Sequence, residues 1–349
     1  MTKPQHHSFL RDDLLRLPGL DALAEQCANR HVLLTGATGF FGCWLLALFD
    51  ELNRRGADIA VTVVSRNPKR FLDDHPHYRN CPWLRWLPMD IRELRELPGR
   101  PAELMLHGAA DTSAAAHARP LELFDTIVEG ARRVLDLAVR SDGARVLFTG
   151  SGAQYGVLPA DSPVVEEHVG ACLSNRVSGT YGEAKRAQET LGAIYAQEHG
   201  LEVVMTRCFA FSGPGLPLNA HFAIGNFVRD ALSAEEIVLN SSGRAMRSYL
   251  HGADLAVWLL TLLLRGKPGA AYNVGSDQAI SIAELARRVT DRVAPGKCVR
   301  VLGQADDSGR SYYVPDISRA RALGLDVWTT LDRSIESMAA WAKSLGYVN

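Results

Sequence analysis

The feature that most constrains the fold is an alternation, between residues 31 and 209, of short apolar runs with longer segments of helical periodicity. Runs that are apolar throughout are typical of strands covered on both faces, and the intervening helices supply the crossovers of a parallel sheet. The sequence therefore predicts a doubly wound α/β fold whose ligands bind beyond the carboxyl ends of the strands. The expected strands span 31–36, 59–65, 84–90, 102–108, 145–150 and 201–209, and the expected helices 43–56, 121–141 and 180–200.

Charge and cysteine usage argue against several classes of protein. The 349 residues carry a formal net charge of −1, so no strong field attracts the chain to nucleic acid or to an anionic membrane. The longest apolar run, 255–264, is too short to span a bilayer, and the acidic N-terminal segment does not resemble a signal peptide. The six cysteines are scattered without a C-x-x-C pair, which argues against a metal cluster or disulfide framework and favours a cytoplasmic location.

A glycine-rich turn, TGATGFFG, joins the first expected strand to the first expected helix. Its glycines have the spacing G-x-x-G-x-x-G, which allows a tight turn, a close approach of the backbone to a pyrophosphate and close packing of the helix on the strand. A tight turn without a ligand is the alternative. The predicted cofactor contacts in this turn are Gly36, Thr38, Gly39, Phe40, Phe41 and Gly42.

The end of the second strand indicates which dinucleotide is bound. NAD sites usually carry an acidic residue here, which accepts hydrogen bonds from the ribose hydroxyls. This chain has Ser65 and Arg66 instead, and a hydroxyl beside a guanidinium suits a 2′-phosphate. We therefore predict NADP in preference to NAD, with solvated surface arginines as the alternative.

Further cofactor contacts are expected after the third and fourth strands. Asp90, with Ile91 beside it, is placed to accept a hydrogen bond from the adenine amino group, or else to cap a helix. In HGAAD, Ala109 and Ala110 would let the nicotinamide side of the cofactor pass close, or would simply allow tight packing. His107 is expected to be a hydrogen-bonded structural histidine of this site.

Tyr181 and Lys185 lie four residues apart at the start of an expected helix and therefore share a face. A nearby ammonium lowers the pKa of a phenol, about 10 when unperturbed, and makes it a more effective base. Ser151 follows the fifth strand in the segment GSGAQYG. We predict that these three residues are catalytic, and the alternative for Tyr181 is an ordinary aromatic residue of a first helical turn.

Together these motifs give the chain a family resemblance. TGATGFFG, the Asp90 turn, HGAAD, SGAQYG, YGEAK, TRCFAFSGPG, RSYLHGADLA and YNVGS follow one another from about residue 30 to 275. The chain resembles the extended short-chain dehydrogenases/reductases of the nucleotide-sugar epimerase and dehydratase kind. The resemblance implies a Rossmann-type sheet, a smaller discontinuous substrate-binding domain, a nucleotide-diphosphate sugar as substrate and a homodimer.

The expected domains follow from this resemblance and from the change of pattern after residue 210. Residues 1–28 form an N-terminal unit, in which 8–28 is predicted to be one amphipathic helix. The dinucleotide-binding domain comprises 29–210 and about 246–275, and the substrate-binding domain comprises about 211–245 and 276–349.

The resemblance also implies the course of the reaction. Tyr181 would take the proton from a sugar 4-hydroxyl while C4 passes a hydride to the nicotinamide, and Ser151 would hydrogen-bond the same oxygen. Lys185 would hold the cofactor. Arg247 matches the diphosphate-binding arginine of the family, with a surface charge as the alternative. The other predicted substrate contacts are Asp111, Ser151, Gly152, Ala153, Asn226 and Arg310.

The turn after Ser151 departs from part of the family. Dehydratases of the family carry an Asp–Glu pair where this chain has Gly152 and Ala153, and decarboxylases of the usual pattern carry a glutamate at the second position. The turn therefore favours a 4-epimerase. Asparagine is also common at the positions of Ile127 and Ala210, and its absence indicates an unusual substrate.

Other functions remain open at this point. They are a 4-keto-sugar reductase, a 4,6-dehydratase with displaced acid and base residues, a non-enzymatic dinucleotide-binding redox sensor, and a structural assembly protein that binds no cofactor.

Overall fold

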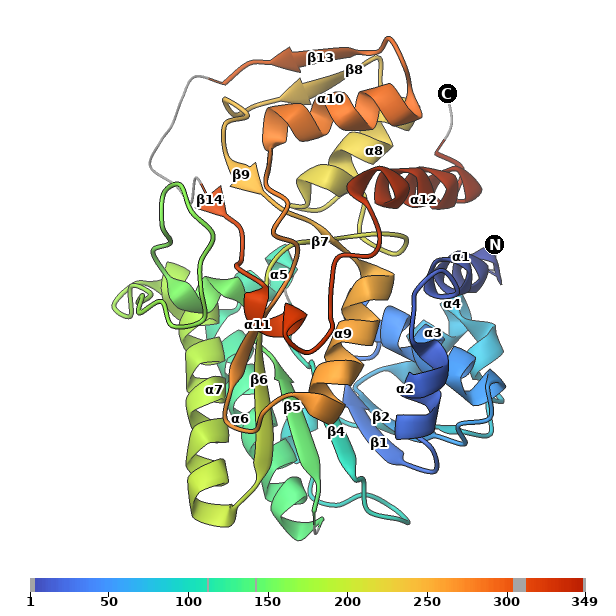
Figure 1. Ribbon diagram of the computed structural model, residues 1–349, viewed down its shortest axis with the longest axis vertical. Coiled ribbons are helices and arrows are strands. Elements are labelled where there is room, and N and C mark those ends of the chain that lie inside the picture. Colours follow the sequence, from blue (N-terminus) through green and yellow to red (C-terminus); the bar gives the residue numbers. More distant parts are fainter. Residues whose placement is uncertain (1–3, 112, 142, 304–311, 348–349) are drawn as a thin grey trace.

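The computed structural model describes residues 4–111, 113–141, 143–303 and 312–347 (Figure 1). Its centre is a seven-stranded parallel sheet with the order β3-β2-β1-β4-β5-β6-β11. The strand order reverses between β1 and β4, and a ligand crevice is expected outside the carboxyl ends at such a point. The strands are β1 (His31–Thr35), β2 (Ala60–Ser65), β3 (Leu84–Pro88), β4 (Leu104–His107), β5 (Arg145–Thr149), β6 (Glu202–Cys208) and β11 (Ala271–Val274).

Helices cover both faces of this sheet, because successive residues of a strand point to opposite sides. Leu34 of β1 belongs to an apolar cluster with α3 (Phe40–Arg54) and α9 (Gly252–Arg265). Its neighbour Leu33 belongs to a cluster with α6 (Pro120–Arg140) and α7 (Thr180–His199). The predicted α/β fold is thus confirmed, and the expected strands and the helices near 43–56, 121–141 and 180–200 are present with small shifts at their ends.

The N-terminal segment differs from the prediction of one helix over 8–28. Two helices are present, α1 (Pro4–Leu14) and α2 (Leu20–Gln26). Between them lie Pro18, which has no backbone N–H, and Gly19, which has a φ of 78° in the left-handed region. The apolar periodicity continues across this break, which is why the sequence pattern looked like one helix.

A second layer of helices lies beyond the carboxyl edge of the sheet (Figure 1). Its helices α8 (Ala223–Ser233), α10 (Ile282–Val293) and α12 (Leu331–Ser344) share a separate apolar cluster. Three small sheets accompany them. Their strands are β7 (Phe211–Ser212), β8 (Glu236–Leu239), β9 (Met246–Arg247), β10 (Leu250–His251), β12 (Ile280–Ser281), β13 (Cys298–Val301) and β14 (Tyr312–Tyr313).

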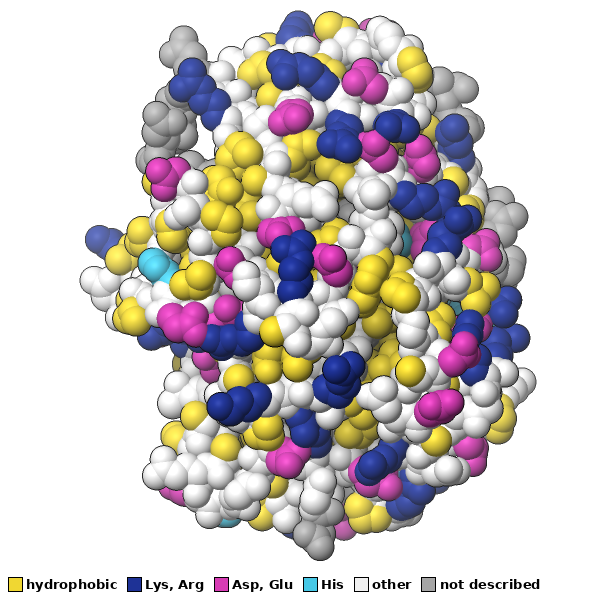
Figure 2. Space-filling model, in the orientation of Figure 1, with side chains coloured by type: hydrophobic (Ala, Val, Ile, Leu, Met, Phe, Trp, Pro, Cys, Tyr) yellow, Lys and Arg dark blue, Asp and Glu magenta, His cyan; other side chains and the backbone are white. Residues whose placement is uncertain are grey.

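Short helical segments complete the fold. The α-helices α4 (Pro68–Asp74), α5 (Ala114–His117) and α11 (Ser318–Arg321) connect the larger elements. Single 3₁₀ turns span Pro76–Tyr78, Ile91–Glu93, Gly152–Tyr155 and Val177–Gly179. Among the described helices, none combines the length and the apolar character needed to cross a membrane. On the face drawn in Figure 2, basic and acidic side chains are intermingled.

Candidate active site

The glycine-rich turn between β1 and α3 shows why each glycine is needed. Gly36 has a φ of 76°, and a Cβ there would lie 2.4 Å from the carbonyl oxygen of Gly108. A Cβ on Gly42 would lie 2.2 Å from the backbone of Ala37. At Gly39 a Cβ would meet only the Gly36 oxygen, at an ordinary 3.6 Å. The fold itself therefore requires the outer glycines, whereas Gly39 leaves the open backbone that a diphosphate needs at the start of a helix.

The other predicted residues of this turn divide by exposure. Thr38 is exposed, next to Gly39. Phe40 packs against Trp44, and Phe41 meets Phe211 edge-on with the ring centres 4.9 Å apart. The two phenylalanines thus fix the start of α3, and the exposed backbone around Thr38 fits a dinucleotide.

Arg66 follows β2 and lies in a shallow pocket that also contains Asp111 and Arg119. Glu122 of α6 pairs with both arginines, at 3.7 Å from Arg66 Nη1 and 2.6 Å from Arg119 Nη1. Ser65 is the last residue of β2 and is partly buried. This pocket places two guanidinium groups beyond the carboxyl end of the sheet, together with the predicted substrate residue Asp111.

Asp90 is engaged locally. Its Oδ1 accepts a hydrogen bond from the backbone N–H of Arg92, which caps the 3₁₀ turn that starts at Ile91, and both its oxygens accept from the Arg92 guanidinium. These contacts hold the pKa of Asp90 below its usual value. The helix-cap alternative for this residue is therefore present, and Ile91 is buried in the core.

His107 is fully buried, and its tautomer follows from its partners. Thr35 Oγ1 accepts hydrogen bonds from the backbone N–H groups of Gly108 and Ala109, so its own hydrogen is donated to Nδ1 of His107 at 2.8 Å. The proton of the neutral ring then lies on Nε2. Burial, with the Lys185 cation nearby, lowers the pKa of His107 to about 3, so the ring is neutral. The geometry is that of a hydrogen-bonded structural histidine, the role expected for His107, and its place in a cofactor site stays a prediction.

Ser151 stands directly beyond β5 and begins a capped turn. Its Oγ accepts a hydrogen bond from the Ala153 N–H at 3.1 Å, and its N–H donates to Gln154 Oε1 at 2.7 Å. The reciprocal bonds form a capping box, which fixes the Ser151 side chain. The same hydroxyl lies near the phenol of Tyr181 and acts to lower the pKa of that phenol.

Lys185 lies one helical turn after Tyr181 and is only 2% exposed. Its Nζ donates to the Thr149 carbonyl at 2.6 Å and to Gln188 Oε1 at 3.0 Å. Burial lowers the pKa of Lys185 to about 8, since the ammonium has lost water. The structure thus brings Ser151, Tyr181 and Lys185 together at the end of β5, as predicted from their order in the sequence.

Tyr181 is partly buried between apolar and polar groups. It packs against Leu123, Ile127 and Ala184, and its ring meets the His117 imidazole edge-on with the ring centres 5.7 Å apart. Loss of solvent raises the pKa of Tyr181 well above its ordinary value, while the nearby Ser151 hydroxyl acts in the opposite direction. A phenol in such a setting needs a nearby positive charge to lose its proton.

Tyr313 is the site residue that the sequence analysis missed. A Cβ built on Gly152 would lie 2.6 Å from the Tyr313 hydroxyl, and Tyr313 also contributes to the raised pKa of Tyr181. Tyr313 is paired in register with Arg247, whose guanidinium lies 5.8 Å from the ring centre. Tyr313 therefore lies between Arg247, the predicted diphosphate-binding residue, and Gly152 of the turn that carries no acid. In the sequence, the one residue of this segment predicted to bind substrate was the neighbouring Arg310.

The remaining predicted substrate residues are less informative. Asn226 lies on α8, where its Nδ2 donates to the Ala220 carbonyl and its Oδ1 accepts from Arg229. Ala210 is partly buried against the apolar cluster of α8, α10 and α12. Arg310 lies outside the described residues.

Behind the turn lies a buried network that contains charged groups. Gln154 Nε2 donates to Glu189 at 2.7 Å, and Glu189 forms a salt bridge with Arg207 at 2.6 Å. Tyr155 donates to Asn273 Oδ1 at 2.7 Å and lies under the Arg207 guanidinium, 4.7 Å from the ring centre. Burial raises the pKa of Tyr155 to about 12, so this phenol is not a base at neutral pH. The network holds the turn through Gln154 and Tyr155, and its Glu189 comes from α7, the helix that also carries Tyr181 and Lys185.

Comparison with known proteins agrees with these features. The model of the "NAD dependent epimerase/dehydratase family" matches residues 32–275. The chain belongs to this family. Its match begins in β1 and ends just after β11, so it includes the glycine-rich turn, Ser151, Tyr181 and Lys185.

Individual relatives differ in activity. UDP-glucuronic acid decarboxylase 6 of Arabidopsis thaliana is 27% identical over 298 residues, which cover 84% of this chain and 83% of that protein. The structure of UDP-glucose 4-epimerase from Thermotoga maritima has a TM-score of 0.76 at 19% identity, covering 90% of this chain and 99% of the other. RMD from Pseudomonas aeruginosa, complexed with NADPH, has a TM-score of 0.71 at 22% identity, covering 91% and 100%. The protein is thus an enzyme of a family that modifies nucleotide sugars.

Proposed function

We propose that this enzyme is a nucleotide-sugar 4-epimerase. The observation that carries the proposal is the contrast within one site: Ser151, Tyr181 and Lys185 are assembled for hydride chemistry, and the adjacent Gly152 and Ala153 bring no acid or base. Elimination of water or of carbon dioxide needs further groups at the sugar, whereas oxidation and reduction at one carbon need only a base and hydrogen-bond donors.

The proposed roles follow from the contacts of each residue. A bound nicotinamide dinucleotide would accept the hydride from C4 and return it. Tyr181 holds and moves the proton of the 4-hydroxyl, and Ser151 orients that oxygen through its own fixed hydroxyl. Lys185 is anchored on the Thr149 carbonyl, one helical turn after Tyr181, and its proposed role is to supply a positive charge to the phenol. Such a charge is what a phenol that has lost solvent requires to act as a base.

Tyr313 supports the same reaction in preference to dehydration. Its hydroxyl fills the space into which a side chain at position 152 would project. We propose that Tyr313 lines the substrate pocket between the sugar and the diphosphate, with Arg247 behind it. Asp111 and Asn226 remain proposals as substrate contacts.

For the cofactor we propose NADP. Arg66 and Arg119 share a pocket beyond β2, and their shared partner Glu122 can release one of them to a phosphate. The comparison variants are Arg66→Ala and Arg70→Ala, because Arg70 is an exposed arginine nearby on α4. Arg66→Ala should weaken NADP binding at least tenfold and change NAD binding little. Arg70→Ala should change neither affinity appreciably. Tighter binding of NAD than NADP by the wild type would overturn the assignment.

A dimer and the two-domain division also remain proposals. Leu121 and Phe124 on α6 and Ile194 on α7 are exposed apolar side chains on the two helices that cover one face of the sheet. Burial of these side chains against a second copy would remove apolar surface from water. Sedimentation tests this: the wild type should be a dimer, and the Leu121→Ser, Phe124→Ser double variant should be a monomer. A monomeric wild type would contradict the proposal.

The activity test uses UDP-, dTDP-, GDP- and CDP-sugars, with UDP-glucuronate among them, in the absence of added reductant. Epimerisation at C4 without net consumption of cofactor is the expected result. Product that requires stoichiometric NADPH would identify a 4-keto-sugar reductase. A 4-keto-6-deoxy product would indicate a dehydratase, and release of carbon dioxide a decarboxylase; any of the three would contradict the epimerase assignment.

A further inference from the structure

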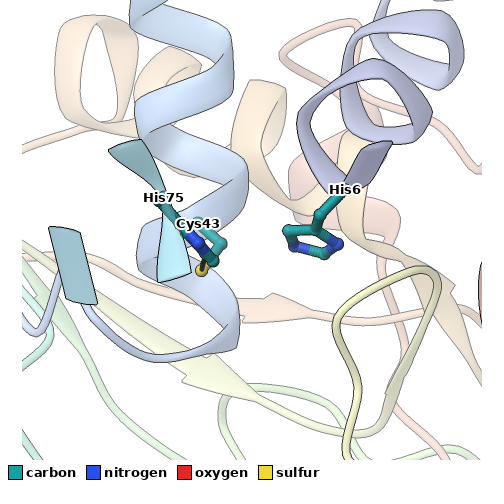
Figure 3. A group of neighbouring side chains, drawn as sticks. All are labelled: His6, Cys43 and His75. Carbon is teal, nitrogen blue, oxygen red and sulfur yellow. Dashed lines mark hydrogen bonds between the residues drawn. The ribbon is translucent and has the colours of Figure 1, made fainter. Parts of the chain in front are cut away.

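Three side chains with metal-binding atoms meet outside the site described above. His6 comes from α1, Cys43 from the first turns of α3, and His75 from the residue that follows α4. Their candidate ligand atoms all lie within 4.8 Å of one another. Figure 3 shows Cys43 and His75 close together, with the imidazole of His6 facing them from the opposite helix.

The spacing is close to that of a tetrahedral zinc site. With Zn–S of about 2.3 Å and Zn–N of about 2.0–2.1 Å, a thiolate sulfur and an imidazole nitrogen on one ion lie about 3.6 Å apart. Cys43 Sγ and His75 Nε2 are 3.9 Å apart. The widest separation in the group, at most 4.8 Å, exceeds the spacing of two tetrahedral ligands by about 1.2–1.5 Å, a gap that movement of two side chains can close. Small movements of these side chains would therefore bring all three into coordination.

The surroundings favour a bound ion. His6 is buried, and Cys43 and His75 are partly buried. The three line one small pocket, whose other lining residues are His7, Leu10, His77 and Tyr78. The ring of Phe71 contacts His75 edge-on, with the ring centres 4.2 Å apart, and helps to hold that imidazole in place.

We propose that His6, Cys43 and His75 bind one divalent ion of borderline softness, zinc in the first place. Two imidazoles and a thiolate suit zinc, whereas magnesium and calcium require oxygen ligands. On binding, the Cys43 thiol loses its proton to solvent and the sulfur donates its electron pair to the ion. Three protein ligands leave the fourth tetrahedral position to water.

Local spacing in the sequence gives no sign of this cluster. His6, Cys43 and His75 come from three separate segments of the chain, and the packing of α1 against α3 brings His6 towards Cys43. An ion here would join α1, α3 and the segment after α4. It would also stand one residue from Gly42, at the base of the glycine-rich turn, so it would stabilise the geometry of that turn. The inference does not depend on the sugar chemistry proposed above.

The experiment uses the full chain without a histidine tag. Metal-free protein is titrated with Co²⁺, which reports thiolate coordination by an intense ultraviolet charge-transfer band and tetrahedral geometry by visible bands. The ligand variants are Cys43→Ser, His6→Gln and His75→Gln. The matched controls are Cys81→Ser and His168→Gln. In the wild type, the Cys81 thiol donates to the His77 carbonyl, and the His168 ring bonds the Val157 carbonyl.

We expect one Co²⁺ per chain, displaced by Zn²⁺. Each ligand variant should lose more than about 100-fold in affinity, because changes in groups that only support a metal ligand already cost 10–100-fold. The controls should stay within about threefold. At a Zn²⁺ concentration 100 times the dissociation constant, the melting temperature should rise by roughly 4 °C.

Two results would overturn the proposal: absence of the thiolate band in the wild type, or wild-type affinity in Cys43→Ser. A second measurement serves if a ligand variant fails to fold. Zn²⁺ should protect Cys43 of the wild type from alkylation by iodoacetamide, while the exposed Cys298 reacts equally with and without the metal. Equal alkylation of Cys43 under both conditions would also overturn the proposal.

Discussion

Two sets of residues at the segment 150–156 differ in the kind of group that holds them. In the first set, the reaction side, Ser151 and Lys185 bond backbone groups and side-chain amides, and the Ser151 hydroxyl lies near the Tyr181 phenol. No carboxylate is among the described partners of these three residues. In the second set, the support side, Gln154 and Tyr155 are held by a network that includes two glutamates and an arginine.

The difference shows how a reactive site can be rigid without being acidic. The carboxylates that fix the turn, Glu189 and Glu166, bond to Gln154, Arg207 and Asn273. None of their described contacts is with a predicted catalytic residue, so charge can position the turn without adding an acid or base to the reaction. The predictions below test this separation, from the largest expected effect to the smallest.

Removal of one phenolic oxygen should have different consequences on the two sides. Tyr181→Phe deletes the proposed base and should lower kcat by about 10²–10⁴-fold, the usual worth of acid–base catalysis. Tyr155→Phe deletes a buried hydrogen bond to Asn273 and should cost about 1–2 kcal/mol of stability, with kcat within about threefold of wild type. Steady-state kinetics and urea unfolding of both variants decide. An equal loss of kcat in Tyr155→Phe would contradict the separation.

Neutralising Glu189, a carboxylate of the network that holds the turn, should change stability more than kcat. Glu189→Gln leaves the partly buried Arg207 without its countercharge and should lower the free energy of unfolding by about 2–3 kcal/mol. Glu198→Gln changes an exposed glutamate of the same helix and should stay within about 0.5 kcal/mol. The expected kcat of Glu189→Gln in the folded state is near that of wild type. A large loss of kcat without a loss of stability would assign Glu189 to the reaction.

The free energy of unfolding should fall at acid pH because His107 is buried in its neutral form. Its pKa is lowered to about 3 in the folded protein, against about 6.5 in the unfolded chain, so only the unfolded chain takes up this proton between these values. Stability therefore falls as the pH decreases from 6.5 towards 3, and this residue should account for roughly 1.5 kcal/mol between pH 6.5 and 5. Urea unfolding of wild type and His107→Gln measures this. Parallel pH dependence in the two proteins would refute it.

The smallest expected effect is that of filling the space between Gly152 and the Tyr313 hydroxyl, measured as kcat/KM. Gly152→Ala places a Cβ against the Tyr313 hydroxyl and should lower kcat/KM by about 5–10-fold, or about 1 kcal/mol, because the phenol must move. In a Tyr313→Ala background the same change should cost little. A double-mutant cycle measures the coupling. Additive effects of the two changes would mean that Tyr313 does not restrict this position.

The sequence predicted those features that depend on local pattern. Apolar runs and their spacing predicted the strands of the sheet, and motif order predicted that Ser151, Tyr181 and Lys185 would meet. Features that depend on long-range packing were not predictable in this way. Tyr313 comes near Gly152 from β14, which pairs with β9, a strand about 65 residues earlier in the chain. The support of Tyr155 by Asn273 likewise joins residues 118 positions apart. The break between α1 and α2 does have a local signal, Pro18 and Gly19, which the continuous apolar periodicity concealed.

The position of β11 at the edge of the sheet has a consequence for synthesis of the chain. Asn273 of this strand bonds Tyr155, Glu166 and the Val164 carbonyl, and β11 pairs only with β6. A nascent chain that has not yet reached residue 274 therefore exposes the edge of β6 and lacks the anchor of the catalytic turn. Limited proteolysis of ribosome-stalled chains should show residues 157–176 cleaved readily when the chain ends near 265 and protected once β11 has emerged. On this prediction, the catalytic turn gains its anchor only after the other six strands of the central sheet have been synthesised.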